Sequence, residues 1–285
     1  MPRLFHISRP ILGAILVSLA AVNSGCGAFA VDNGGLFPLP TIHIVWPTPD
    51  GAGLDVEQVT LTADNGEPLH GWFIPAEAPR ATVIMHHGAL TNRSSTIAHY
   101  RLLNRHHYNV FVYDYQGFGE SLVLATITTV LPDADVALEY VQQREGPGSD
   151  RIIIFGQSMG TLPAIAQAAR SPDRVVGLVV EGSFTETLPT WAFTLLGIAP
   201  DPIAFSRIPD ELVSANNIVH VTIPKRFLHS RDDLTTPIGG ARQLYELAPE
   251  PKSFFETFGI HLDAINRDPA YEPALVEFLD EVSGA

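Results

Sequence analysis

The sequence has a single cysteine, Cys26, so the chain cannot form an internal disulfide. Charged residues are scarce as well, at 17% of the 285 residues. Lysine and arginine number 17 against 31 acidic residues, which gives a formal net charge of −14. The basic residues form no cluster. Because neutralising phosphates requires grouped basic side chains, we expect no nucleic-acid partner.

Motifs of several enzyme classes are also missing. The chain contains neither G-x-x-x-x-G-K-[ST] nor a dinucleotide-binding fingerprint, which argues against a nucleotide-binding enzyme. Its 11 histidines include the adjacent pairs His86-His87 and His106-His107, but no H-E-x-x-H or Cys-His spacing accompanies them. We therefore expect no metal site. The hydrophobic fraction of 46% is typical of a globular protein rather than a disordered one.

The N-terminus has the pattern of an export signal. Arg3 and Arg9 make a basic start, and residues 11–22 form an apolar core that is too short to span a bilayer. Ser24-Gly25-Cys26 follows that core directly and resembles a bacterial lipobox, in which the cysteine becomes the lipidated first residue. We therefore expect an exported lipoprotein that is anchored to a membrane of the cell envelope through Cys26.

Two other fates of this segment stay open. Ala28-Phe29-Ala30 fits the A-x-A pattern of ordinary secretion, so cleavage after residue 30 would release a soluble secreted or periplasmic protein. An uncleaved segment would instead act as an N-terminal anchor helix. The lipobox interpretation divides the chain into a signal peptide at residues 1–25, a linker at 26–53 and one domain at 54–285. No break in composition within the last range suggests a second domain.

The most informative stretch is the apolar run at residues 151–155, which ends in Gly156-Gln157-Ser158-Met159-Gly160. Small, helix-compatible residues follow this G-x-S-x-G at once, so the pattern predicts a strand, a tight turn and a helix. Glycines without a Cβ let the strand and helix approach closely while the serine adopts a strained backbone. The stretch predicts a nucleophile elbow with Ser158 as the nucleophile.

The remaining pattern predicts an α/β fold. Asp64-Asn65-Gly66 lies between two strand-like segments and is typical of an antiparallel hairpin. The predicted strands are residues 56–63, 69–75, 81–85, 109–113, 151–155, 175–181, 225–229 and 253–258. The predicted helices include residues 132–143, with Asp133 and Asp135 in the first turn, 237–247 and 273–282. We therefore expect an eight-stranded, mostly parallel sheet with helices on both faces, and an active site beyond the carboxyl ends of its strands.

Residues 184–221 break this alternation, after the sixth strand. They carry several prolines and a group of apolar side chains, among them Trp191, Phe193, Leu195, Leu196, Ile198 and Phe205. The segment is predicted to be a helical lid over the strand ends. The alternative is an irregular excursion that packs on the core without a role in binding.

A serine on an elbow needs a histidine base, and that histidine needs an acid to orient it. The segment at residues 227–237 is a strand that runs into an acidic turn with Asp232 and Asp233, and residues 258–261 are a strand end in the form Phe-Gly-Ile-His. Their order after the serine matches the order serine, acid, histidine. His261 is therefore the predicted base. Glu181, at the end of the preceding strand, is a substitute acid.

These segments together resemble the α/β-hydrolase superfamily, in particular its single-domain serine hydrolases with a D-Y-x-G-x-G-x-S segment, which here is Asp114 to Ser121. His87-Gly88 and Leu69-His70-Gly71-Trp72 are similar too, and the likeness covers about residues 54–282. The family pattern H-G-x-x-D-x-x-x-P implies that Asp233, rather than Asp232, is the acid. Ser230 stands where the family usually has glycine.

The resemblance implies the α/β-hydrolase fold and a serine hydrolase that needs no cofactor. Its oxyanion hole is expected to use the backbone N–H groups of Met159 and Ala89, with Leu90 as the alternative to the latter. The expected substrate is a small-molecule carboxylic ester. An acyl-thioesterase and a peptidase or amidase remain alternatives because the same triad serves each leaving group. From another class, the chain could be a catalytically silent envelope lipoprotein that binds an apolar ligand or a partner.

Overall fold

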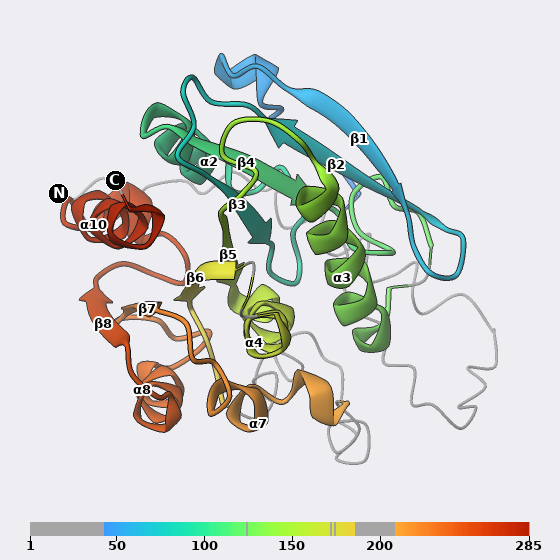
Figure 1. Cartoon of the computed structure of the whole chain (residues 1–285). Coiled ribbons are helices and arrows are strands. Elements are labelled where there is room, and N and C mark those ends of the chain that lie inside the picture. Colours follow the sequence, from blue (N-terminus) through green and yellow to red (C-terminus); the bar gives the residue numbers. More distant parts are fainter. Residues whose placement is uncertain (1–42, 124, 172, 174, 186–208, 285) are drawn as a thin grey trace, which may run out of the picture. The chain divides into compact units, whose positions relative to one another are not determined.

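The computed structural model of the protein describes residues 43–123, 125–171, 173, 175–185 and 209–284. A single sheet of eight strands runs through them, in the order β1-β2-β4-β3-β5-β6-β7-β8 (Figure 1). The strands are β1 (Glu57–Thr62), β2 (Pro68–Ile74), β3 (Ala81–His86), β4 (Tyr108–Tyr113), β5 (Ile152–Gln157), β6 (Val175–Glu181), β7 (Lys225–Ser230) and β8 (Lys252–Thr257). β1 and β2 pair antiparallel, β2 pairs antiparallel with β4, and all other pairs are parallel. The expected eight-stranded sheet with an antiparallel N-terminal hairpin is confirmed.

The central strands are apolar on both faces because helices cover both. Every residue of β3, β4 and β5 is buried, as expected for strands in the middle of a parallel sheet. Successive side chains alternate between two cores: Ile84 and Ile154 face one of them, and Val83 and Ile153 face the other. The sequence pattern of these strands is therefore set by burial on two sides.

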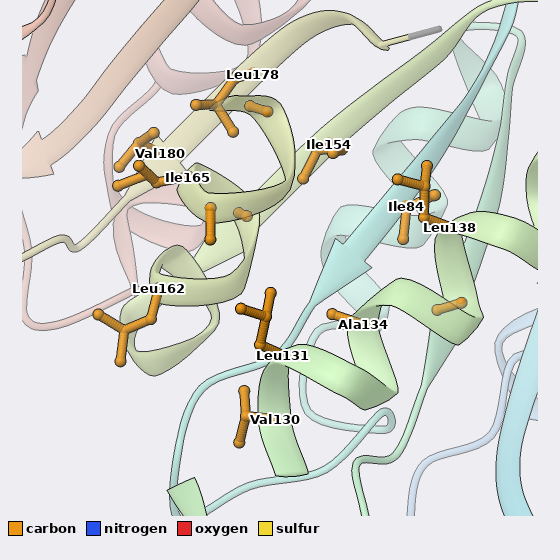
Figure 2. Packing of buried hydrophobic residues seen from close by; sticks show 14 of the residues in the cluster. Ile84, Val130, Leu131, Ala134, Leu138, Ile154, Leu162, Ile165, Leu178 and Val180 are labelled. Atoms are coloured by element: carbon orange, nitrogen blue, oxygen red, sulfur yellow. The ribbon is translucent and has the colours of Figure 1, made fainter. Parts of the chain in front are cut away.

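The helices divide between the two faces of the sheet (Figure 1). One face is covered by α3 (Ile127–Gln143), α4 (Thr161–Arg170), α7 (Ser214–Ile218) and α8 (Ile238–Leu247). Figure 2 shows how residues of α3 and α4, such as Leu131 and Ile165, pack with Ile154 and Leu178 of the strands. The other face is covered by α2 (Ile97–Arg105), α9 (Ala264–Arg267) and α10 (Tyr271–Ser283). Three short 3-10 helices complete the described elements: η1 (Asp50–Ala52), η3 (Asp210–Leu212) and, directly after β5, η2 (Ser158–Gly160).

The start of α3 was predicted wrongly. The helix begins at Ile127 rather than at Pro132, which lies inside it. Val130 and Leu131, upstream of the proline, are buried in the core, so the apolar stripe of the helix extends past the residue that interrupts its hydrogen bonding. The gain from burying this turn outweighs the N–H that proline lacks. Asp133 consequently sits in mid-helix, fully buried, and not in a first turn.

The other helix boundaries differ less. α8 matches the predicted residues 237–247 to within one residue, and α10 begins two residues earlier than predicted, at Tyr271. Most of the predicted lid, residues 186–208, lies outside the described residues, as do the predicted signal peptide and Cys26. Of the described end of that segment, Leu212 and Ile218 are buried in the core. Within the described ranges, no helix combines the length and apolar character needed to cross a membrane.

Candidate active site

The predicted site residues meet at one edge of the sheet, beyond the carboxyl ends of β5, β7 and β8. Ser158 follows β5 directly, Asp233 lies three residues beyond β7, and His261 lies four residues beyond β8. β5, β6, β7 and β8 run parallel in adjacent positions, so their ends share one edge of the sheet. Residues more than 100 positions apart in the chain thereby come into contact.

Ser158 sits on a strained turn between β5 and α4. Its φ angle is +52°, a left-handed conformation that costs a residue with a Cβ about 1–2 kcal/mol. The turn also packs tightly against β3, because a Cβ placed on Gly160 would lie 2.6 Å from the carbonyl carbon of His86. The hydroxyl of Thr161 donates to the carbonyl oxygen of Ser158 at 2.6 Å and closes the turn. This is the geometry that the G-x-S-x-G pattern predicts.

The three side chains form one hydrogen-bonded row. His261 Nε2 lies 2.9 Å from Ser158 Oγ, and His261 Nδ1 lies 2.6 Å from Asp233 Oδ2. The acid side of the row is buried, since the Asp233 side chain is 1% exposed against 18% for His261. A neutral imidazole that donates from Nδ1 can accept a proton at Nε2. The row can therefore withdraw the serine proton as the hydroxyl attacks an electrophile.

The Asp233 carboxylate is held by four donors. It accepts hydrogen bonds from the backbone N–H groups of Thr235 and Thr236 at 2.8 and 2.9 Å, and from the Thr236 hydroxyl at 2.9 Å, besides the imidazole of His261. Burial alone would raise the pKa of Asp233, but the hydrogen bonds and charge of His261 and the Thr236 donors lower it below its ordinary value. Asp233 is thus kept ionised in position to stabilise a protonated imidazole.

Two neighbours add to the acid loop. His229 is buried, which lowers its pKa, and its Nε2 donates to the carbonyl oxygen of Thr236 at 2.7 Å. The neutral ring therefore braces the loop without neutralising Asp233. Ser230, which replaces the family glycine, donates through its hydroxyl to the carbonyl oxygen of Gly259 and so connects the acid loop to the loop that carries His261.

The substitute acids lie elsewhere. Asp232 is exposed, and the backbone N–H of Gly259 contacts it at 3.5 Å. Glu181 is buried in a separate cluster with Gln157, His99 and Tyr271. The backbone groups expected at an oxyanion hole flank the serine: Met159 is fully buried, and a Cβ on Gly88, next to Ala89, would lie 3.1 Å from Ser158 Cβ. The alternative donor, Leu90, has a φ angle of +58°.

The sequence interpretation missed two buried groups at this edge. One is the cluster around Glu181. The other is Arg93, whose guanidinium is buried and pairs with the carboxylates of Asp114 and Glu120. The guanidinium carbon also lies over the ring of Trp72, 4.5 Å from its centroid. This pairing holds the segment that begins at Asp114 in place. Among the described residues, no group of histidine, cysteine, aspartate or glutamate side chains could hold a metal ion.

Comparisons with known proteins show which family the chain resembles. The family model described as "Serine aminopeptidase, S33" matches residues 77–204. "Uncharacterized protein YfhR" of Salmonella typhi is 31% identical over 271 residues, which are 87% of this chain and 88% of that protein. "Alpha/beta hydrolase domain-containing protein WAV2" of Arabidopsis thaliana is 26% identical over 263 residues, with 85% of each chain covered.

The chain belongs to the α/β-hydrolase superfamily. The solved structure of the Pyrococcus furiosus esterase Pf2001 superimposes with a TM-score of 0.73, at 20% identity, over 86% of this chain and 98% of that one. This likeness shows that the α/β-hydrolase fold is shared. The family match supports hydrolase activity.

Proposed function

We propose that the protein is a serine hydrolase that cleaves carboxylic esters through an acyl-enzyme. The observation that carries the proposal is the row of Ser158, His261 and Asp233, with hydrogen-bond distances of 2.9 and 2.6 Å. Nucleophile, base and orienting acid within hydrogen-bond reach of one another are the requirement for serine catalysis.

In the first half of the reaction, Ser158 Oγ attacks the ester carbonyl carbon while His261 Nε2 takes the hydroxyl proton. The carbonyl oxygen becomes an oxyanion, which the N–H groups of Met159 and Ala89 stabilise. Asp233 stabilises the imidazolium formed on His261. That imidazolium then donates its proton to the departing alcohol, and the C–O bond to the alcohol breaks, which leaves an acyl group on the serine.

In the second half, His261 takes a proton from a water molecule as the water attacks the acyl carbon. Collapse of the second tetrahedral intermediate releases the acid, and the proton returns to Ser158 Oγ. The imidazole of His261 is 18% exposed, so water can reach it. Atoms balance with one ester and one water consumed, and one acid and one alcohol formed.

We propose an ester rather than another acyl compound as the substrate because the Pf2001 structure, which has the same fold, is that of an esterase. A second candidate is cleavage of peptide bonds, which the description of the matching family model as serine aminopeptidase favours. The same serine, base and acid would serve it, since only the leaving group differs. Thioesters are the third acyl class that these residues could hydrolyse.

The test is labelling of the purified protein with a fluorophosphonate, followed by p-nitrophenyl esters of increasing acyl length and an aminoacyl p-nitroanilide. We expect labelling and ester turnover in the wild type, and a loss of at least about 10³-fold in kcat in Ser158→Ala. Ser149→Ala is the matched control, because this serine lies at the opposite, amino-terminal edge of the sheet, where its hydroxyl donates to the carbonyl oxygen of Gly146. Unchanged turnover in Ser158→Ala would refute the proposal. Absence of labelling with saturable binding of an apolar ligand would favour the catalytically silent binding protein.

We further propose that the hydrolase works in the cell envelope as a lipoprotein anchored through Cys26. The lipobox-like Ser24-Gly25-Cys26 after an apolar core supports this placement.

A further inference from the structure

A buried polar cluster lies directly behind the nucleophile and takes no part in the chemistry proposed above. It consists of Gln157 at the end of β5, Glu181 at the end of β6, His99 in α2 and Tyr271 at the start of α10. Each of the four residues is at most 3% exposed. The cluster therefore joins four elements that come from distant parts of the chain.

Gln157 and His99 both approach one carboxylate oxygen of Glu181, and Tyr271 contacts His99. Gln157 Nε2 donates to Glu181 Oε2 at 2.6 Å, and His99 Nε2 lies 3.4 Å from the same oxygen. His99 Nε2 also lies 2.9 Å from the Tyr271 hydroxyl and 3.2 Å from Gln157 Nε2. Burial and the nearby Glu181 carboxylate raise the pKa of Tyr271 well above its ordinary value, so its hydroxyl stays a hydrogen-bond donor.

Stability alone does not account for this cluster. Apolar side chains of similar volume often replace a buried ionic group without loss of stability. Here, moreover, Glu181 Oε1, Gln157 Oε1 and His99 Nδ1 have no hydrogen-bond partner among the described residues, and each such buried atom is unfavourable for folding. A buried polar cluster of this kind is better explained by a role in fixing local geometry than by packing.

The cluster touches both reacting residues through the backbone. On one side, Gln157 immediately precedes Ser158 in the chain. On the other, Gly182 immediately follows Glu181, and a Cβ placed on Gly182 would lie 3.0 Å from Cε1 and 3.4 Å from Nδ1 of His261. The backbone after Glu181 therefore lies against the imidazole of the base. The contact between Gln157 and Glu181 thus connects the segment that carries the nucleophile with the segment that packs against the base.

We propose that Glu181 is a positioning residue that fixes Ser158 relative to His261. The proposal rests on the serine hydrolase function proposed above. Gln157 and Glu181 are register partners at the last pair of β5 and β6, beyond which no ladder holds the two strand ends together. The carboxylate supplies that link and is tied in turn to α2 and α10 through His99 and Tyr271. Asp233, and not Glu181, remains the acid that contacts His261.

The test uses Glu181→Met in the full-length protein, assayed with a p-nitrophenyl ester. This change keeps the approximate size of the side chain and removes both its charge and the oxygen that accepts the hydrogen bond of Gln157. We expect kcat to fall by about 10- to 100-fold, because misplacing reacting groups by about 1 Å has effects of that size. KM is expected to stay within about twofold of wild type, because the cluster is buried behind the strand ends and does not line the entry to Ser158. Fluorophosphonate labelling of Ser158 should slow in parallel with kcat.

A second variant and a control separate positioning from stability. Gln157→Met leaves the carboxylate in place and removes the link to Glu181, so it should lower kcat by a similar factor. The double variant should lose no more than the worse single variant, because both changes break the same contact. Asn109→Ala is the matched control: Asn109 is a buried, hydrogen-bonded polar residue at the amino ends of the strands, so its loss should lower the melting temperature and leave kcat unchanged.

The outcomes distinguish the two proposals. A folded Glu181→Met variant with kcat within about twofold of wild type, in a protein whose turnover depends on Ser158, would overturn the positioning role alone. Losses that multiply in the double variant would overturn it as well, because the two residues would then act independently. A wild type without turnover or labelling would overturn both proposals. If Glu181→Met does not fold, Gln157→Met and its kcat decide the matter.

Discussion

Gly160→Ala should damage both the stability and the activity of the protein, because the elbow packs against the backbone of β3. A Cβ at position 160 would lie 2.6 Å from the carbonyl carbon and closer still to the carbonyl oxygen of His86, and 2.7 Å from the carbonyl oxygen of His87. Ordinary contact begins at 3.4 Å. The two backbones would therefore have to separate by 0.8 Å at the His86 carbonyl carbon, the difference between 3.4 and 2.6 Å.

Both segments are buried in the centre of the sheet, so this separation cannot be absorbed by a side chain that swings away. Overpacking of this kind costs about 1–3 kcal/mol, and we expect a value near the upper end, about 3 kcal/mol. The strain falls between Ser158 and the turn after β3 that carries Ala89, the two sides of the proposed reaction centre. A displacement of this size should lower kcat by about 10²-fold.

The assay is chemical denaturation combined with ester hydrolysis. Gly239→Ala is the matched control, because a Cβ on Gly239, in α8, meets no atom within 4 Å. Alanine there should raise stability by up to about 1 kcal/mol through helix propensity and leave kcat unchanged. A Gly160→Ala variant as stable as wild type, within about 0.5 kcal/mol, and equally active would refute the close packing of the elbow on β3.

Two further predictions concern other parts of the chain. Burial raises the pKa of the Asp133 carboxyl from 3.8 to about 6. The folded protein therefore holds this proton more tightly than the unfolded chain does. The free energy of unfolding should fall by about 3 kcal/mol as the pH rises from about 4 to about 6. Asp133→Asn cannot titrate and should lack that part of the slope in urea denaturation at a series of pH values, and identical slopes would contradict the assignment. For the envelope, labelled palmitate should be incorporated into the wild type and not into Cys26→Ala, which should leave the membrane fraction; an unlabelled wild type would dispose of the lipid anchor.

The central strands of this fold could be predicted because each is a short, mainly apolar run. The segments at β3, β5 and β6 are buried at nearly every position, so apolar residues lie on both faces of these strands. The position of Ser158 on a strained strand-to-helix turn could also be predicted, because the G-x-S-x-G pattern directly after such a run is typical of that turn. His261 and Asp233 then followed from chain order and the family likeness. The structure places them within hydrogen-bond distance of Ser158 and of each other, and their catalytic roles stay a prediction.

Helix boundaries and the cluster around Glu181 could not be obtained in this way. The segment that forms α2 places His99 and Tyr100 on its buried side, where a periodicity search expects aliphatic residues. His99 and Tyr271 meet across 172 positions of sequence, and neither has a local signal. Two of the four residues could have been predicted to lie together. Gln157 precedes the nucleophile and Glu181 ends the next strand, and parallel pairing of the two strands places these residues side by side.

The left-handed backbone of Ser158 has a consequence for laboratory evolution. Glycine adopts a φ of +52° without the penalty that serine bears there. Position 158 is therefore one at which a residue that abolishes the proposed chemistry fits the fold more comfortably than the residue that performs it. A library sorted for thermal resistance alone would enrich inactive glycine variants at this codon, so every round of selection should include a turnover screen.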